Sequence, residues 1–254
     1  MTREEFAAEL DRIFCAPHAE RGIMRLSETG LLAEHLPEVE RLKGVEQPPA
    51  FHPEGDVFVH TMLMLSHISW PEADLGWAVL LHDVGKPAAR TCDASGAMHF
   101  YGHEEIGAQM AEEILLRFGF GEARRERIVH AVRCHMRFAH FDRMRSSKQR
   151  SVINAPGFAL ELELHRVDCL CSNGLLGNYV LMLDLLHEEQ SREQDPEPLL
   201  SGQDLIGAGF APGPVFSLIF RRILQEQKAG RILTKEDALK FLCSFKDKMK
   251  CGLQ

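Results

Sequence analysis

Residues 77–86 read WAVLLHDVGK. An apolar run is followed by a histidine and an aspartate, and a glycine comes two residues later. The apolar part is typical of a buried helix, and Gly85 followed by Pro87 is the punctuation of a helix C-terminus. His82 and Asp83 therefore stand at the end of a buried helix. Because burying such polar side chains is costly unless something binds them, the stretch predicts both a helical core and a functional site.

The rest of the chain shows the same helical periodicity. Apolar residues recur at three- and four-residue spacing, while alternating or β-branched runs are scarce. We therefore predict an all-α fold, with short helices before residue 48 that are broken at Gly30 and Pro37. The longer helices are expected near residues 56–68, 72–84, 103–118, 122–136 and 156–188.

Three segments are expected along the chain. Residues 1–48 form a helical neck, and residues 49–190 form the domain that holds the candidate site. Residues 191–254 form a linker and a helical tail, because the polar, proline-bearing segment from Glu188 to Pro198 is typical of a linker.

Composition narrows the class of protein. No run approaches the roughly 18 apolar residues of a membrane span, and the acidic start does not resemble a signal peptide. We therefore expect a soluble, cytoplasmic protein with no membrane partner. Its seven cysteines fit reduced thiols. Cys169 and Cys171 are spaced one residue short of a zinc knuckle, so we interpret them as small buried hydrophobes.

The net charge of −8 argues against a protein that coats nucleic acid nonspecifically, because that mode requires an excess of basic residues. We expect no DNA partner. Residues 117–150 are an exception, with ten Lys or Arg against three acidic residues. This stretch is either a solvated helix face or a patch that attracts phosphate. Both interpretations remain open at the level of sequence.

Two further polar residues lie in apolar helical surroundings. His60 stands in residues 57–63, VFVHTML, and Asp168 lies between Leu164 and Leu170. Each has an ordinary alternative, a core histidine for the first and a surface carboxylate for the second. Together with His82 and Asp83, however, they could converge from three helices on one cation, because imidazole and carboxylate groups are both metal ligands.

In chain order, His60, His82, Asp83 and Asp168 resemble the H…HD…D signature of the HD superfamily of metal-dependent phosphohydrolases. The resemblance implies a helical fold in which these four residues hold a divalent metal ion. Mn, Fe, Ni, Co, Mg and Zn all suit such a ligand set. The continuation Val84-Gly85-Lys86 also matches the family, in which the lysine reaches toward substrate phosphate.

His103 and His135 fall where HD proteins with two metal ions place their additional ligands. Two ions could share Asp83 and activate a bridging water. His103 could equally neighbour the ligands or bind substrate, so one ion and two ions both remain open. His130, His140 and His165 are off the pattern, and we expect them beside the ligands or at the surface.

The hypothesis assigns roles to other polar residues. Asp83 would orient a water activated by the metal, and Glu104 would relay the proton of the leaving group. Lys86, Arg133 and Arg137 would bind the substrate and neutralise its phosphoryl oxygens. No protein nucleophile is required.

Longer stretches resemble bacterial CCA-adding tRNA nucleotidyltransferases and poly(A) polymerases, downstream of their catalytic head. The resemblance implies hydrolysis of phosphomonoesters or 2′,3′-cyclic phosphodiesters of nucleotides or RNA ends. No counterpart of the nucleotidyltransferase head precedes Asp56, so we expect the chain not to add nucleotides by itself. The stretches that carry the resemblance are residues 31–38, 44–47, 51–57, 60–61, 100–104, 165–170, 200–205, 213–214 and 236–239.

Two alternatives belong to other classes of protein. The chain could be a module that binds tRNA or other RNA and works with a separately encoded nucleotidyltransferase head. It could also be a regulatory protein whose HD site binds a nucleotide without turnover. The acidic net charge weighs mildly against the RNA-binding module, whereas the family resemblance of the neck and tail weighs for it. The complete ligand set weighs against the regulatory protein.

Overall fold

The computed structural model describes residues 1–48, 55–94, 96–193 and 196–251. Residues 51–54 of the stretches that carry the family resemblance, and residues 194–195 of the expected linker, lie outside the described residues. The chain divides into two compact units, Met1–Leu186 and His187–Gln254. Each unit is described by itself.

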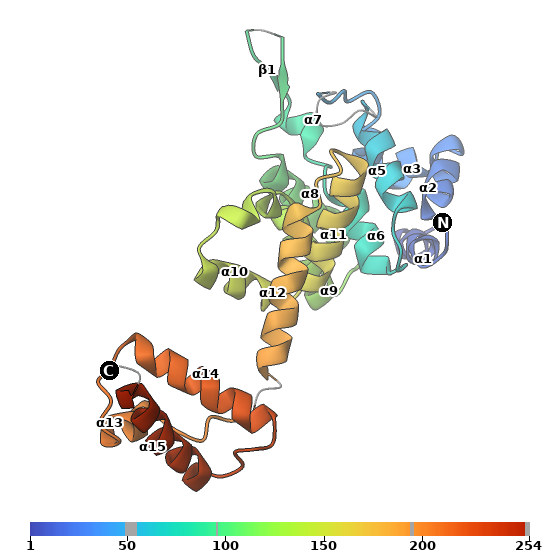
Figure 1. The fold of residues 1–254 in the computed structure, drawn as a ribbon. Coiled ribbons are helices and arrows are strands. Elements are labelled where there is room, and N and C mark those ends of the chain that lie inside the picture. Colours follow the sequence, from blue (N-terminus) through green and yellow to red (C-terminus); the bar gives the residue numbers. More distant parts are fainter. Residues whose placement is uncertain (49–54, 95, 194–195, 252–254) are drawn as a thin grey trace. The chain divides into compact units, whose positions relative to one another are not determined.

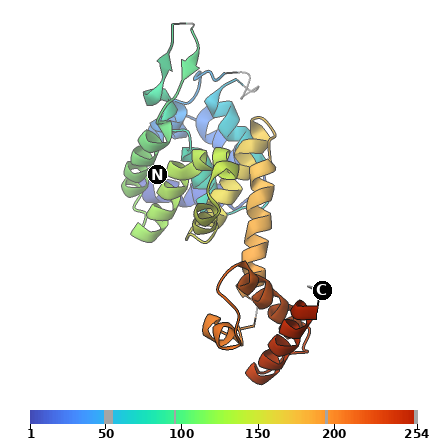
Figure 2. The same cartoon turned by 60° about the vertical axis from the view of Figure 1, so that its left-hand side comes forward.

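The prediction of an all-α fold is confirmed, since the described strands are limited to one short antiparallel hairpin (Figures 1 and 2). The helices that begin in the first unit, and the strands, are α1 (Arg3–Phe14), α2 (Ala19–Glu28), α3 (Leu31–His35), α4 (Pro37–Glu40), α5 (Val57–Ser66), α6 (Ala73–Leu81), α7 (Lys86–Ala89), β1 (Thr91–Cys92), β2 (Met98–His99), α8 (His103–Arg117), α9 (Glu122–Cys134), the 3-10 helix η1 (His135–Arg143), α10 (Ser146–Ile153), α11 (Phe158–Cys171) and α12 (Gly177–Glu193).

Helix α6 is the centre of the first unit. Every residue from Asp74 to Leu81 is buried, and the helix packs against α1, α5, α9 and α11. The Trp77 ring lies edge-on to Phe14 of α1, with ring centroids 5.7 Å apart. The apolar run that ends in His82 and Asp83 is therefore part of the main core.

The N-terminal helices are joined to this core by a polar network as well as by apolar packing. Arg124 at the start of α9 donates hydrogen bonds to Asp11 of α1 and to Asp74 of α6. The Trp77 indole N–H also donates to Asp11, at 2.8 Å. Because Asp74 is buried, the guanidinium groups of Arg124 and Arg127 compensate the cost of burying its charge.

The single helix expected over residues 156–188 is two helices, so that prediction was wrong. Helix α11 ends at Cys171, and α12 begins at Gly177. Gly174 between them has a φ of 70°, a conformation that glycine adopts without steric cost. Helix α12 continues to Glu193, so residues 188–193 of the expected linker are helical.

The described residues of the second unit form three further helices, α13 (Gly202–Gly207), α14 (Pro214–Lys228) and α15 (Lys235–Cys251). A capping box between Ser201 and Asp204 starts α13, and Leu205, Ile219 and Leu242 contribute to a separate small core. Among the helices in the described part of the chain, none combines the length and the apolarity that a membrane span requires.

Candidate metal centre

His82 and Asp83 lie where α6 ends. His82 is the C-cap residue of the helix, and both side chains are 2% exposed. The turn that follows packs directly on α8. A Cβ atom added to Gly85 would lie 2.3 Å from the carbonyl oxygen of His103 and 2.5 Å from the amide nitrogen of Gly107. Only a glycine permits this approach, which brings the first residue of α8 against Asp83.

Two more histidines reach the same carboxylate. The Nε2 atom of His103 lies 3.3 Å from Asp83 Oδ1, and that of His135, just after α9, lies 3.9 Å from the same oxygen. The Nε2 atoms of His103 and His135 are 3.1 Å apart. The two histidines predicted as additional ligands are therefore next to Asp83.

The protonation of these rings follows from their other nitrogen. In His82, His103 and His135, Nδ1 donates a hydrogen bond to the backbone carbonyl three residues earlier, at 2.7, 2.8 and 2.6 Å respectively. This contact places the proton of the neutral imidazole on Nδ1 and leaves the lone pair on Nε2. The three lone pairs then point toward the Asp83 carboxylate or toward one another.

Such an arrangement fits a bound cation. The Nε2 atom of His82 is buried and has no hydrogen-bond partner within the described residues, although it lies 3.0 Å from Asp83 Oδ2. Unprotonated nitrogens and a carboxylate oxygen at these distances repel one another unless a positive charge lies between them. Imidazole nitrogens and carboxylate oxygens are together the donors of many divalent-metal sites.

The remaining pair of predicted ligands, His60 and Asp168, is joined to the cluster through His82 and Asp83. His60 of α5 and Asp168 of α11 meet at 3.2 Å, from Nε2 to Oδ1, and the His60 ring centroid is 5.6 Å from that of His82. Donor atoms of His60, His82 and Asp83 lie within 4.8 Å of one another, as do those of Asp83, His103 and His135. Asp83 is thus shared by two adjacent donor groups.

Burial and charge set the ionisation of the cluster. Burial disfavours the ionised form of Asp83, but His82 and Lys86 hold the pKa of its carboxyl well below the usual value. Burial lowers the pKa of His135 to about 4, with His82 acting in the same direction. The pKa of His103 is raised because the contact with Asp83 outweighs burial.

The other predicted residues differ in their distance from the cluster. The Lys86 ammonium is buried, 2.7 Å from Asp83 Oδ2, and donates to Gln47 Oε1 at 2.5 Å. Glu104 lies 3.5 Å from Nδ1 of His103, the ring nitrogen that faces away from Asp83. The sequence did not predict that Gln47 holds Lys86. The only sequence signal for Gln47 was that it lies in a stretch that carries the family resemblance.

The basic stretch is largely engaged by acidic side chains. Arg133 pairs with Glu105 and Arg137 with Glu161, so the structure directs these two predicted substrate-binding residues toward carboxylates outside the cluster. This favours the solvated-face interpretation for the first part of residues 117–150. The basic residues of the stretch that form ion pairs include Arg117, Arg124, Arg125, Arg127, Arg133 and Arg137.

The histidines off the pattern lie outside the two donor groups around Asp83. His165 is buried beside Cys169 and Phe138, and His140 is exposed. His130 contacts Cys134 and Glu161, a combination that the sequence reasoning did not consider.

Comparison with known families identifies an HD domain over residues 57–155. Residues 6–43 match a family described as "Probable RNA and SrmB- binding site of polymerase A". The chain therefore carries an HD domain preceded by a segment of an RNA-binding family, which confirms the resemblance seen in the sequence.

Curated relatives extend this similarity along the chain. The CC-adding tRNA nucleotidyltransferase of Thermus thermophilus is 33% identical over 94% of this chain and 56% of its own length. The A-adding tRNA nucleotidyltransferase of Deinococcus radiodurans is 31% identical over 94% of this chain and 57% of its own length. The Multifunctional CCA protein of Halorhodospira halophila is 41% identical over 50% of this chain. The chain spans little more than half the length of the first two relatives.

Proposed function

We propose that this HD-domain chain is a cytoplasmic, metal-dependent phosphohydrolase that acts on phosphomonoesters or 2′,3′-cyclic phosphodiesters of nucleotides or RNA ends. The observation that carries the proposal is the convergence of three imidazole Nε2 atoms on the buried Asp83 carboxylate, with His60 and Asp168 alongside. The HD-domain match over residues 57–155 supports it at the level of the superfamily.

The proposal gives each residue a role that agrees with its position. His60, His82, Asp83 and Asp168, with His103 and His135, would hold one divalent cation or two. When bound, a divalent cation supplies an activated water and a positive charge for the phosphoryl oxygens. Lys86 adds a fixed ammonium beside Asp83, and Glu104 contacts the outer nitrogen of His103, where it can accept or return a proton.

The hydrolysis itself needs no group from the protein to bond to the substrate. The oxygen of a water bonds to phosphorus as the bond to the leaving oxygen breaks, and the leaving oxygen ends with a proton. Asp83 orients the water, and the Lys86 charge offsets the negative charge that develops on the phosphoryl group.

The test is release of product from 2′,3′-cyclic AMP, 2′-AMP and a panel of nucleotides with Mg²⁺, Mn²⁺, Ni²⁺ or Co²⁺. We expect Asp83→Asn to lose at least about 100-fold in kcat/KM, because it removes a ligand that both donor groups share. The matched control is Asp142→Asn, an exposed aspartate outside the cluster. Turnover by Asp83→Asn at the wild-type rate, or no turnover by the wild type with any ion, would overturn the proposal.

A second candidate function rests on a different observation. The match of residues 6–43 to an RNA-binding family, and the tRNA nucleotidyltransferases among the relatives, favour binding of tRNA by this chain, as a module beside a nucleotidyltransferase head. Titration of tRNA at several salt concentrations tests it, because phosphate contacts make log K fall linearly with log salt concentration. Asp83→Asn should bind tRNA as the wild type does, so the two functions can be tested separately.

A further inference from the structure

A second group of metal-binding side chains lies outside the HD cluster. His130 and Cys134 are one helical turn apart on α9, so they share a face of that helix. Glu161 faces them from α11. Donor atoms of the three residues all lie within 4.8 Å of one another, so they can reach one ion without rearrangement of either helix.

The observed distances match those of a coordinated ion. Cys134 Sγ lies 3.7 Å from His130 Nε2, and His130 Nε2 lies 3.2 Å from Glu161 Oε1. Tetrahedral zinc, with bonds of about 2.3 Å to sulfur and about 2.0–2.1 Å to nitrogen or oxygen, separates its ligands by about 3.5 Å and about 3.3 Å respectively. The two contacts agree with these values within a few tenths of an ångström.

Glu161 supplies an independent reason to expect a ligand. Its side chain is 1% exposed, and its Oε1 atom is buried with no hydrogen-bond partner among the described residues. The other carboxylate oxygen, Oε2, pairs with Arg137. A buried carboxylate oxygen without a donor is costly, and a cation between Oε1, His130 and Cys134 would compensate that cost.

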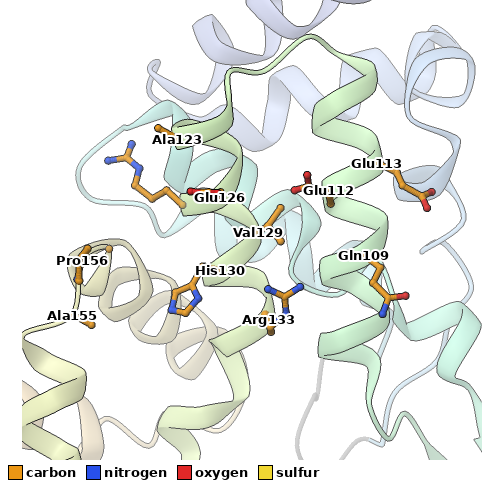
Figure 3. Close-up of a pocket in the computed structure, with 12 residues that line it drawn as sticks. Gln109, Glu112, Glu113, Ala123, Glu126, Val129, His130, Arg133, Ala155 and Pro156 are labelled. Atoms are coloured by element: carbon orange, nitrogen blue, oxygen red, sulfur yellow. The ribbon is translucent and has the colours of Figure 1, made fainter.

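The site has an open side. The His130 side chain is 46% exposed and lines a cavity of about 1090 Å³ between α8, α9 and the segment that includes Ala155 and Pro156. Figure 3 shows the His130 ring beside Arg133 in this cavity. Three protein ligands and access from a cavity are the arrangement of zinc sites that keep a fourth position for water or another ligand.

We propose that His130, Cys134 and Glu161 bind a transition-metal ion at a site separate from the HD cluster. The ion is Zn²⁺, because zinc prefers mixed sulfur, nitrogen and oxygen ligands. Binding forms a bond from the ion to Cys134 Sγ and releases the thiol proton to solvent. The ion also links α9 to α11, the two helices beside His135 and Asp168 of the HD cluster. The fourth coordination position faces the cavity.

Cobalt substitution tests this site in the full chain. Co²⁺ bound to a thiolate gives a sulfur-to-cobalt charge-transfer band in the near ultraviolet, whereas the HD cluster offers only nitrogen and oxygen ligands. We expect the band in the wild type and its loss in Cys134→Ser. The matched control is Cys169→Ser, since Cys169 also lies one turn after a histidine, at 3.6 Å from His165 Nε2, but outside the candidate metal groups.

Glu161→Gln provides a second variant that we expect to fold. Burial raises the pKa of Glu161 to about 7, so the metal-free protein already tolerates a neutral group at this position. We expect Glu161→Gln to weaken Co²⁺ binding at this site by more than about tenfold. Absence of the band in the wild type, its survival in Cys134→Ser, or its loss in Cys169→Ser with Cys134 intact would overturn the proposal.

A measurement on the wild type alone avoids any question of folding. A bound ion should protect Cys134 from alkylation by iodoacetamide, and removal of the ion by a chelator should restore the reaction. Peptide mass mapping reports Cys134 separately from the exposed Cys15, Cys92 and Cys243. Equal alkylation of Cys134 with and without Zn²⁺ would also overturn the proposal.

Discussion

The Nε2 atoms of His103 and His135 lie 3.1 Å apart inside the protein. Both rings carry their Nδ1 proton toward a backbone carbonyl, so the short contact requires either a proton on one Nε2 or a cation beside both. The pKa values assign such a proton to His103, since the pKa of His103 is raised and that of His135 is lowered to about 4. A proton and a metal ion should therefore compete for this place.

We expect metal affinity to decrease as the pH falls through the raised pKa of His103. Protonated His103 has no lone pair for the ion, so each unit of pH below that pKa should cost about tenfold in affinity if one proton is displaced. Calorimetric titration with Mn²⁺ between pH 6 and pH 8 measures this dependence. His103→Gln should flatten it, and an affinity independent of pH in the wild type would contradict the competition.

Lys86→Met should reduce hydrolysis without emptying the metal centre. The ammonium lies beside Asp83 but offers no lone pair to an ion when charged, so its loss removes charge compensation for the substrate and leaves the ligands in place. We expect kcat/KM to fall by about 100-fold, with the metal content per chain unchanged.

The graded control for this prediction is Gln47→Ala. It removes only the hydrogen bond that holds the Lys86 ammonium, so it should cost about tenfold or less. An unchanged kcat/KM in Lys86→Met, or a loss in that variant explained entirely by lost metal, would argue against a substrate role for the ammonium.

Gly85→Ala should destabilise the protein because backbone atoms occupy the space of a new Cβ. Its nearest neighbours would be the His103 carbonyl oxygen and the Gly107 amide nitrogen, neither of which can rotate away. We expect a loss of about 1–3 kcal/mol in the free energy of unfolding, measured in urea.

Gly177→Ala is the matched control for Gly85→Ala. An added Cβ there meets no atom within 4 Å, and the position is the first residue of α12. This substitution should be neutral or stabilising by up to about 1 kcal/mol. Equal effects of the two substitutions would show that the contact between the Gly85 turn and α8 is not tight.

Arg124→Ala should weaken the attachment of the N-terminal helices to the rest of the first unit. The guanidinium bridges Asp11 and the buried Asp74, and its removal leaves Arg127 as the cation paired with Asp74. We expect a cost of about 2 kcal/mol, or roughly 4–8 °C in Tm. The control is Arg145→Ala, because Arg145 is exposed; its free energy of unfolding should stay within about 0.5 kcal/mol of the wild-type value. A similar loss in both variants would contradict the prediction.

Sequence reasoning was most successful where a local pattern determines structure. The all-α class followed from apolar spacing. The break at Gly30 followed from the conformational freedom of glycine, and the break at Pro37 from the fixed φ and missing N–H of proline. The position of His82 and Asp83 at a helix end followed from the apolar run and Gly85. The turn between α11 and α12 was missed because the apolar spacing continues across it, although residues 172–174, Ser-Asn-Gly, are turn formers.

Partners across long sequence separations could not be predicted. The carboxylates that engage Arg124, Arg133 and Arg137 are far from them in the chain, so the stretch looked more positive in sequence than it is in the folded protein. The group of His130, Cys134 and Glu161 was missed for a similar reason. The spacing of His130 and Cys134 is a helical chelate pattern, but the third donor comes from α11.

The carbonyl groups that orient His82, His103 and His135 belong to the peptide backbone. In many metal sites the group behind a ligand histidine is a carboxylate side chain, and one mutation can delete it. No side-chain substitution deletes a backbone carbonyl; only a change in the backbone conformation of the helix moves it. The orientation of these three rings is therefore robust to mutation of neighbouring side chains. Sequences can diverge around the histidines while the ligand geometry is retained.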